Sequence, residues 1–325
     1  MMNEASVVIA PRVDDEMVAG LRNKVRSALV PLIKGDYAYL DLPYHENLGD
    51  TLIWEGTMEF LKKEVGGKCR YATGKDNYVS GKVRPGMTVL LHGGGNFGDL
   101  WPEHQEFRKR VIAAFDENPV IVLPQSVHYE NPENLKADVE FFRAHPDVII
   151  CVRDKKSQDI LETAFPNRIL LVPDMAFFVD VAKYRSGVVP TSGRMLLAKR
   201  IDKEAPAGVD FSVVPESAET RDWPTVEEYP ATLYEGLGRR LKRCRRIKRW
   251  FGIDLSARAI DRYWHRVMRP AYVRAAVDFI DRYDEVWSTR LHITILSMLL
   301  GKKVHVLDNS YNKTRNFLET WFPEK

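Results

Sequence analysis

The sequence predicts an α/β fold in which helices cover a mainly parallel sheet. Short runs rich in Val, Ile and Leu recur along the chain, separated by segments whose apolar residues follow helical spacing. Such alternation is typical of βαβ units and therefore of a parallel sheet with helices on both faces. In addition, polar residues follow one predicted strand after another, at the sheet edge where open α/β folds bind their ligands.

Length and composition limit the organisation and the class of function. With 325 residues, 45% of them hydrophobic, the chain is long enough for two domains. A net charge of +3 does not indicate a nucleic-acid-binding protein. The three cysteines lie far apart without metal-binding spacing, so we expect no metal and no disulfide. No apolar run is long enough to span a membrane and no signal peptide is found, so we expect a cytoplasmic protein.

The first elements are a helix over residues 14–34 and a strand over 36–43, followed by the polar loop YHENLGDT at 44–51, from which a second helix starts. A carboxylate and exposed amides at such a junction suit a ligand, although the same residues can simply form the turn and cap the helix. The candidates in this loop are Asn47, Gly49 and Asp50.

The next strand, 87–91, opens into the glycine-rich segment HGGGNFGDLW at 92–101. Consecutive glycines let backbone N–H groups approach a ligand closely, or they form a tight turn that binds nothing. No G-K-[ST] follows the glycines, so the segment is not a Walker motif and does not predict nucleotide phosphate binding. The candidate ligand contacts here are Gly94, Gly95 and Asn96.

The alternation continues with strands at 120–123, 148–152 and 169–172 and with helices at 132–145 and 155–165. Because the carboxyl ends of parallel strands meet at one edge of a sheet, we expect the polar residues after these strands to lie together. These residues are Gln125, Ser126, Arg153 and Asp174.

A linker rich in Gly, Ser and Pro at 181–194 leads to a second, smaller domain that begins with a strand at 195–198. Residues 203–230 are expected to loop over the surface. The run from Arg239 to Arg249 contains eight Lys and Arg residues and ends beside two aromatic residues, and a long helix at about 258–283 follows. The run suits an anionic membrane surface, but a solvated helix face or a nucleic-acid contact would have the same composition.

The stretch 285–313 predicts a strand, a tight turn, a buried helix and a second strand. Ser288 and Thr289 are expected to cap the helix. The turn carries Arg290 and His292 at the carboxyl end of a strand and beside a helix N-terminus, where anions bind. The alternative is a buried histidine satisfied by its neighbours and an ordinary ion-paired arginine.

Four motifs occur in a specific order along the chain. They are N-L-G-D at 47–50, L-H-G-G-G-N-F-G-D at 91–99, V-R-D at 152–154 and T-R-L-H at 289–292. In this combination the chain resembles the polysaccharide pyruvyl transferase family over about residues 37–321. The tail D-N-S-Y-N-K-T-R-N-F is also similar to that of bacterial exopolysaccharide members.

The resemblance implies two Rossmann-like domains arranged as in GT-B glycosyltransferases, with the active site in the cleft between them. We accordingly expect a helical segment over 1–35, a first domain over 36–185, a smaller domain over 194–310 and a tail over 311–325. The implied reaction transfers the pyruvyl group of phosphoenolpyruvate to sugar hydroxyls, forming a cyclic ketal and releasing phosphate. Phosphoenolpyruvate is a co-substrate, and no cofactor or metal is required. The implied acceptor is a repeat unit linked to polyprenyl diphosphate, which would place the protein peripherally at the inner membrane face.

The family binds phosphoenolpyruvate with an R-L-H motif and a further arginine. The matching residues here are Arg153, Arg290, Leu291 and His292. A histidine can protonate the methylene carbon near neutral pH, so His292 is the expected general acid. Asp50 is the expected base, with Asp174 as the second choice. Further contacts to the substrates are expected from Asn47, Gly49, Gly94, Gly95, Asn96, Gln125, Ser126, Asp174 and Ser310.

Two other functions fit the same sequence. A GT-B glycosyltransferase that uses a nucleotide sugar would share the architecture and the cleft. A membrane-associated scaffold would use the basic run and a degenerate cleft. The family's small loop before N-L-G-D is replaced here by Tyr44-His45-Glu46, which bears on how the acceptor is recognised.

Overall fold

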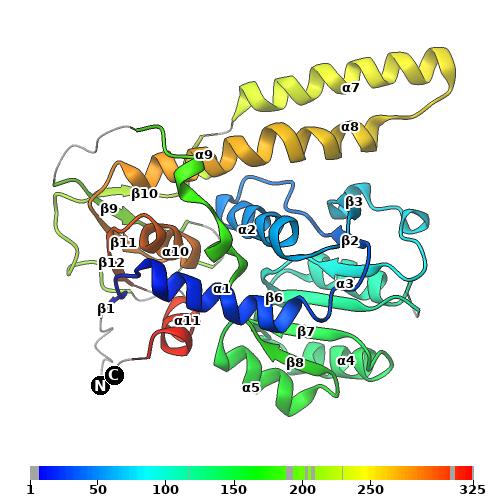
Figure 1. Cartoon of the computed structure of the whole chain (residues 1–325). Coiled ribbons are helices and arrows are strands. Elements are labelled where there is room, and N and C mark those ends of the chain that lie inside the picture. Colours follow the sequence, from blue (N-terminus) through cyan, green and yellow to red (C-terminus); the bar gives the residue numbers. More distant parts are fainter. Residues whose placement is uncertain are drawn as a thin grey trace.

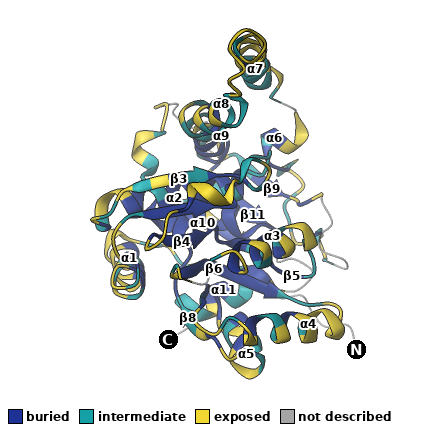
Figure 2. Ribbon diagram, turned by 90° about the vertical axis from the view of Figure 1, so that its right-hand side faces the viewer, coloured by how far each residue is buried: buried dark blue, intermediate teal, exposed yellow. Residues whose placement is uncertain are grey.

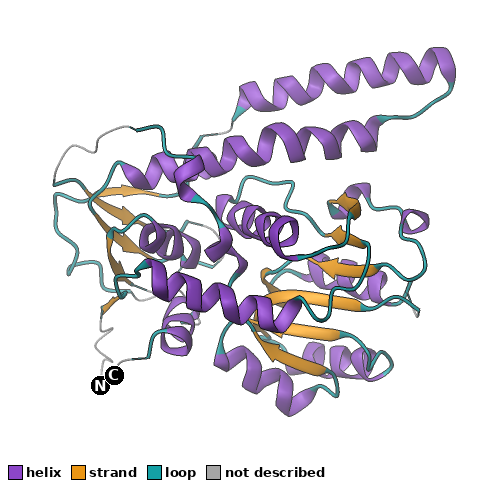
Figure 3. Cartoon of the chain, viewed as in Figure 1, coloured by secondary structure: helices purple, strands orange, loops and turns teal. Residues whose placement is uncertain are grey.

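The computed structural model describes residues 7–323 apart from 116, 188–192, 202–203, 206–208, 229 and 308–311. Within these residues the chain forms an α/β structure with two sheets, which lie apart on the left and the right of the molecule in Figures 1 and 3. The predicted α/β fold with parallel strands is therefore confirmed.

The first sheet has seven strands in the order β3-β2-β4-β6-β7-β8, with β5 paired to β6, and every pairing is parallel. Its central strands are buried on both faces, as expected where helices cover both sides of a parallel sheet. The strands are β2 (Tyr37–Leu40), β3 (Cys69–Thr73), β4 (Thr88–Leu91), β5 (Gly94–Gly98), β6 (Val120–His128), β7 (Ile149–Val152) and β8 (Arg168–Leu171). The helices of this half are α1 (Asp15–Leu29), α2 (Leu48–Glu64), α3 (Pro102–Ile112), α4 (Pro132–Arg143) and α5 (Lys155–Ala164).

The second sheet has five strands in the order β1-β12-β11-β9-β10, and only the pairing of β1 with β12 is antiparallel within the described residues. The N-terminal strand therefore joins a sheet built from the C-terminal part of the chain. The strands are β1 (Val8–Ile9), β9 (Met195–Ala198), β10 (Glu219–Arg221), β11 (Glu285–Ser288) and β12 (Lys303–Val306). Helix α10 (Leu291–Leu299) packs on β11 and β12, with α9 (Arg269–Asp281) beside it.

Helix α2 joins the two halves in the interior. It packs against α9, α10 and the 3-10 turn Met175–Phe178. A Cβ on Gly56 would clash with the carbonyl oxygen of Met175, so only glycine permits this approach. One continuous hydrophobic cluster results, which runs from Leu21 on α1 through Trp54 on α2 to Phe317 on α11 (Lys313–Trp321).

Strands β5 and β6 differ from the prediction. The glycine-rich segment is not only a turn, because five of its residues form β5 against β6. Strand β6 continues through Pro124 to His128, so Gln125 and Ser126 lie inside a strand rather than in a loop. Pro124 has no N–H to donate, and the pairing with β7 shifts register there. Tertiary pairing has overridden the local preference of glycine and proline for turns.

Two further predictions are wrong in detail. Residues 203–230 contain β10 and the short helix α6 (Pro224–Glu227), which the polar sequence of this segment did not indicate. The N-cap of α10 is Arg290, without a side-chain cap. Ser288 instead bonds the backbone N–H and carbonyl of Arg290, at 3.0 and 2.9 Å, while Thr289 donates to the carbonyl of Ala198 at 3.2 Å.

A helical hairpin projects from the body at the top of Figure 1. Its outer helix, α7 (Ala231–Phe251), contains the whole basic run. The inner helix α8 (Ser256–Tyr263) continues into α9 through the π-helical turn Trp264–Met268, so the long helix predicted at about 258–283 is confirmed, with one π-helical turn inside it. Pro270, just after this turn, lacks the N–H that would continue the α-helical ladder, which favours the local change of helix type. Among the helices that the structure describes, none combines the length and hydrophobicity that crossing a membrane requires.

Candidate active site

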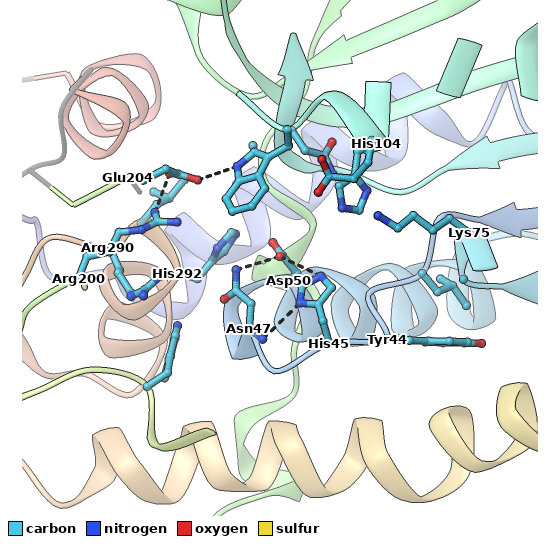
Figure 4. A pocket seen from close by; sticks show the side chains of 18 of the residues that line it. Tyr44, His45, Asn47, Asp50, Lys75, His104, Arg200, Glu204, Arg290 and His292 are labelled. Carbon is cyan, nitrogen blue, oxygen red and sulfur yellow. Dashed lines mark hydrogen bonds and ion pairs between the residues drawn. The ribbon is translucent and has the colours of Figure 1, made fainter. Parts of the chain in front are cut away.

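A pocket of about 410 Å³ lies between the two sheets (Figure 4). Both halves of the chain line it, at the carboxyl ends of their strands. The first half contributes Tyr44, His45, Asn47, Asp50, Lys75, Gly95, Asn96, Trp101 and His104. The second half contributes Arg200, Glu204, Trp223, Arg290, Leu291, His292 and Lys313.

His292 lies in the first turn of α10 and faces the first half. Its Nε2 lies 3.3 Å from Asp174 Oδ2 and 3.3 Å from Arg153 Nη1. A Cβ on Gly49 would lie only 2.7 Å from His292 Nδ1, so glycine is required for the ring to fit. Burial lowers the pKa of His292; Asp174 opposes this effect and Arg153 adds to it, with a net shift downward. The imidazole is therefore mostly uncharged at neutral pH.

Arg153 is fully buried behind the pocket. Its Nη1 donates to Asp174 Oδ2 at 2.6 Å and its Nε to Ser126 Oγ at 3.0 Å. Burial acts to raise the pKa of Asp174, but His292 and Arg153 outweigh it and hold the pKa well below its usual range. Among the described residues Arg153 Nη2 has no hydrogen-bond acceptor, and a Cβ on Gly95 would lie 3.3 Å from it. A buried donor without an acceptor is costly, and this nitrogen lies close behind Gly95, which lines the pocket.

Arg290 comes from the opposite half but is already part of a buried ion pair. Its Nε and Nη2 donate to the two carboxylate oxygens of Asp222, each at 2.6 Å. The carboxylate that the Arg290 guanidinium binds with two hydrogen bonds is therefore that of Asp222, a side chain of the protein itself. Arg290 still lines the pocket, and Asp222 fixes its orientation there.

Lys313, the first residue of α11, completes this cationic end of the pocket. Its Nζ lies 3.5 Å from Glu204 Oε2, and Glu204 also pairs with Arg200 at 2.6 Å. A Cβ on Gly95 would clash with the Lys313 ammonium, so the glycine-rich segment makes room for a cation. Burial lowers the pKa of Lys313 to about 8, although Glu204 opposes the shift.

Asp50 lies in the first turn of α2 and faces the pocket. Asn47 Nδ2 donates to its Oδ2 at 2.9 Å, and His45 Nε2 lies 3.6 Å from the same oxygen. Burial acts to raise the pKa of Asp50, but His45 and His292 outweigh it, and the pKa lies below its usual value. Asn47 also caps α2, because its Oδ1 accepts from Gly49 N at 3.0 Å. Asn47 therefore both caps α2 and lines the pocket, the two roles between which the sequence did not decide.

The opposite end of the pocket carries His104, Lys75 and Tyr44, which Figure 4 shows away from Arg290. His104 Nδ1 lies 3.0 Å from Asp41 Oδ1, which is buried. Asp41 has a φ of 65°, a strained value for a residue other than glycine that is common at functional sites.

The structure divides the predicted site residues into a lining group and a supporting group. The lining group is Asn47, Asp50, Gly95, Asn96, Arg290, Leu291 and His292. The supporting group, which does not line the pocket, is Gly49, Gly94, Gln125, Ser126, Arg153 and Asp174. Gln125, for example, positions the glycine-rich segment, because it donates to His92 O at 2.7 Å and accepts from Asn96 N at 3.4 Å. Ser310 lies outside the described residues.

Sequence reasoning did not single out several charged residues of the pocket. Arg200, Glu204, Lys313 and the titratable His104 line the pocket, and Asp222 pairs with Arg290 behind it. All except His104 lie in or next to irregular segments of the second half, where no periodic pattern pointed to them. Only Lys313 had a signal, since it belongs to the tail motif. In the part of the chain that the structure describes, no group of His, Cys, Asp and Glu has the arrangement of a metal site.

Comparison with known proteins identifies close relatives over most of the chain. A "Putative pyruvyl transferase EpsO" of Bacillus subtilis is 33% identical over 311 residues, which cover 93% of this chain and 90% of that protein. "Pyruvyl transferase 1" of Schizosaccharomyces pombe is 25% identical over 87% of this chain and 69% of its own length. The fold matches the crystal structure of a functionally uncharacterised protein from Klebsiella pneumoniae, with a TM-score of 0.61, 19% identity and coverage of 92% and 93% of the two chains.

A family model completes the comparison. The model described as polysaccharide pyruvyl transferase matches residues 47–311, a range that includes the N-L-G-D, glycine-rich, V-R-D and T-R-L-H motifs. These motifs supply His292, Arg290, Asp50 and Gly95 to one pocket. The resemblance noted from the sequence is thereby confirmed, and the chain belongs to the polysaccharide pyruvyl transferase family.

Proposed function

We propose that this protein transfers the pyruvyl group of phosphoenolpyruvate to two hydroxyls of a sugar, forming a cyclic ketal and releasing inorganic phosphate. The observation that carries the proposal is His292, a buried histidine between a carboxylate and an arginine at the cationic end of the pocket of a pyruvyl transferase family member. Arg153, Arg290 and Lys313 suit the carboxylate and phosphate of the donor, which carry negative charge at neutral pH.

In this mechanism His292 gives a proton to the methylene carbon of phosphoenolpyruvate. The carbon that bears the phosphate becomes oxocarbenium-like, and a sugar hydroxyl adds to it while Asp50 accepts the hydroxyl proton. The bond from this carbon to the phosphate oxygen breaks, and the second hydroxyl attacks the carbon to close the ketal. The proton of this second hydroxyl passes to the departing phosphate, and the proton on Asp50 exchanges with solvent while His292 is protonated again. Burial keeps the pKa of His292 low in the free protein. The negative charge of the bound donor would raise this pKa, and His292 would then be protonated and able to act as the acid.

The opposite end of the pocket supports the sugar acceptor in this proposal. Tyr44 offers an aromatic ring, and His104 and Lys75 offer hydrogen-bonding groups. We infer that the two halves correspond to the domains of a GT-B-like arrangement, with the pocket as the cleft between them. The acceptor is inferred to be a lipid-linked repeat unit, as in exopolysaccharide assembly.

The test is incubation with phosphoenolpyruvate and candidate oligosaccharides, followed by mass spectrometry and an assay of free phosphate. A mass gain of one pyruvyl ketal with equimolar phosphate is expected, and His292→Gln should slow both by about 10²–10⁴-fold. Phosphate release without a change in the sugar would contradict pyruvyl transfer. Turnover of a nucleotide sugar in place of phosphoenolpyruvate would instead identify a glycosyltransferase.

A further inference from the structure

We propose that the hairpin of α7 and α8 docks this protein onto an anionic lipid bilayer, with the basic face of α7 on the headgroups and the hairpin tip in the interface. The inference does not depend on pyruvyl transfer, because bilayer binding is measured without substrate. It rests on the apolar tip, on the distribution of charge along α7 and on the way the hairpin is fixed to the body.

The tip of the hairpin exposes three large apolar side chains next to one another. Trp250, Phe251 and Ile253 are 77%, 73% and 54% exposed, and Figure 2 shows the outer helix α7 as largely exposed. Gly252 ends α7 with a φ of 70°, a left-handed conformation that turns the chain at this point. Exposed aromatic residues at one end of a basic helix have the composition of an interfacial anchor.

The two faces of α7 have different environments. Leu233 and Leu237 pack against the core, and Cys244 is buried, so the apolar stripe of the helix is covered. All eight Lys and Arg residues between Arg239 and Arg249 are exposed, whereas Glu235 is the one acidic residue of the helix.

Few of these cations are neutralised within the protein. Arg239 lies 3.8 Å from Glu235, Lys248 lies 2.8 Å from Asp254, and Arg240 stacks over the ring of Tyr263. No ion pair is found among the described residues for the remaining cations, Lys242, Arg243, Arg245, Arg246 and Arg249. A cluster of this size beside apolar residues favours an anionic lipid surface, because a soluble polyanion would not need the apolar tip.

The base of the hairpin is fixed at the active-site pocket. Tyr44, which lines the pocket, stacks on Trp264 with ring centroids 5.0 Å apart and donates to Asp261 Oδ1 at 3.1 Å. Asp261 also accepts from Thr73 at 2.8 Å and from Asn77 at 3.1 Å. The hairpin is therefore a rigid arm rather than a loose extension, and docking its tip on a membrane would hold the pocket near the lipid surface.

The experiment is flotation of the full-length protein with vesicles of phosphatidylglycerol and phosphatidylcholine, with pure phosphatidylcholine vesicles as the neutral comparison. Binding to the anionic vesicles is expected at about 0.1 M salt, weaker at several-fold higher salt, with little binding to neutral vesicles. Arg243→Gln with Arg246→Gln should reduce partitioning roughly tenfold. The matched control, Arg84→Gln with Lys136→Gln, removes two exposed cations elsewhere and should bind like the wild type.

The apolar tip is tested separately. Trp250→Ser with Phe251→Ser should weaken vesicle binding, whereas Val79→Ser with Val213→Ser, at exposed positions outside the hairpin, should not. Brominated lipids should quench less tryptophan fluorescence in Trp250→Phe than in the wild type. Failure of the wild type to float at the lower salt would overturn the proposal, as would equal losses in hairpin and control variants. Equally tight binding of single-stranded nucleic acid by the same residues would assign the basic face to a different partner and would also overturn it.

Discussion

In the proposed reaction, His292 gives up a proton to carbon. Glutamine can retain a hydrogen bond to Asp174 but cannot protonate carbon, so His292→Gln should lower turnover by about 10²–10⁴-fold. The dissociation constant for phosphoenolpyruvate, measured by calorimetry, should change much less. Near-normal turnover of the glutamine variant would show that the imidazole only positions the donor.

Lys313 should give the reaction an alkaline limit. Its pKa is lowered from the usual lysine value to about 8, so the cation that we propose attracts the donor is lost as the pH rises through that value. We expect kcat/KM for phosphoenolpyruvate to fall above about pH 8 in the wild type. In Lys313→Met, kcat/KM should be low throughout and this particular fall should be absent. An unchanged alkaline profile in the methionine variant would assign the titration to another group.

The Arg290–Asp222 pair should act as one unit. Asp222→Asn leaves a buried guanidinium without its carboxylate, and the free energy of unfolding in urea should drop by about 3–5 kcal/mol. Arg290→Gln should cost a similar amount. The double variant should cost clearly less than the sum, because neither charge is then left alone. Additive losses would mean that the two side chains contribute independently.

At the scale of elements, the glycine-rich strand β5 is adapted to the side chains that lie against it. Gly95→Ala would place a methyl group against the Lys313 ammonium and 3.3 Å from Arg153 Nη2. Because the lysine end can shift, we expect a large rise in KM for phosphoenolpyruvate with a small change in melting temperature.

Gly56→Ala provides the contrast, because its methyl group would meet the backbone of Met175. Backbone cannot shift as a lysine end can, so this variant should lose stability before it loses donor affinity. Gly81→Ala, where a Cβ would meet nothing within 4 Å, is the control for both measurements. A Gly95→Ala variant with unchanged KM would separate this glycine from donor binding.

Some elements of the fold and some residues of the site could be predicted from the sequence, and others could not. Apolar runs identified β4, β7, β11 and α10 because burial leaves a periodic pattern in the sequence. Strand β10 consists of Glu219, Thr220 and Arg221 at a sheet edge, so it has no such pattern. For the site, strand ends pointed to Asp50 and His292, but Asp222 follows a strand that could not be recognised. Its pairing with Arg290 therefore could not be foreseen.

At the scale of the whole molecule, each end of the chain packs on the half built mainly from the other end of the sequence. Strand β1 crosses into the second sheet, whereas α11 returns to the first half. There Trp321 Nε1 donates to Arg153 O at 2.8 Å, and Thr320 Oγ1 accepts from Lys155 N at 3.0 Å. The C-terminal helix thus supports Arg153 with one end and supplies Lys313 with the other. A site assembled by such crossings depends on tertiary contacts that no local pattern contains.

The antiparallel pairing of β1 with β12 also has a kinetic consequence. Val8 pairs with Val306, so this contact closes a loop of nearly the full chain and should be among the last to form during folding. Until then β12 is an open edge that another copy can pair with. Removal of residues 1–10 should therefore slow refolding little but increase concentration-dependent aggregation, as measured by light scattering during dilution from urea. Refolding of the truncated chain without extra scattering would show that β12 needs no such cover.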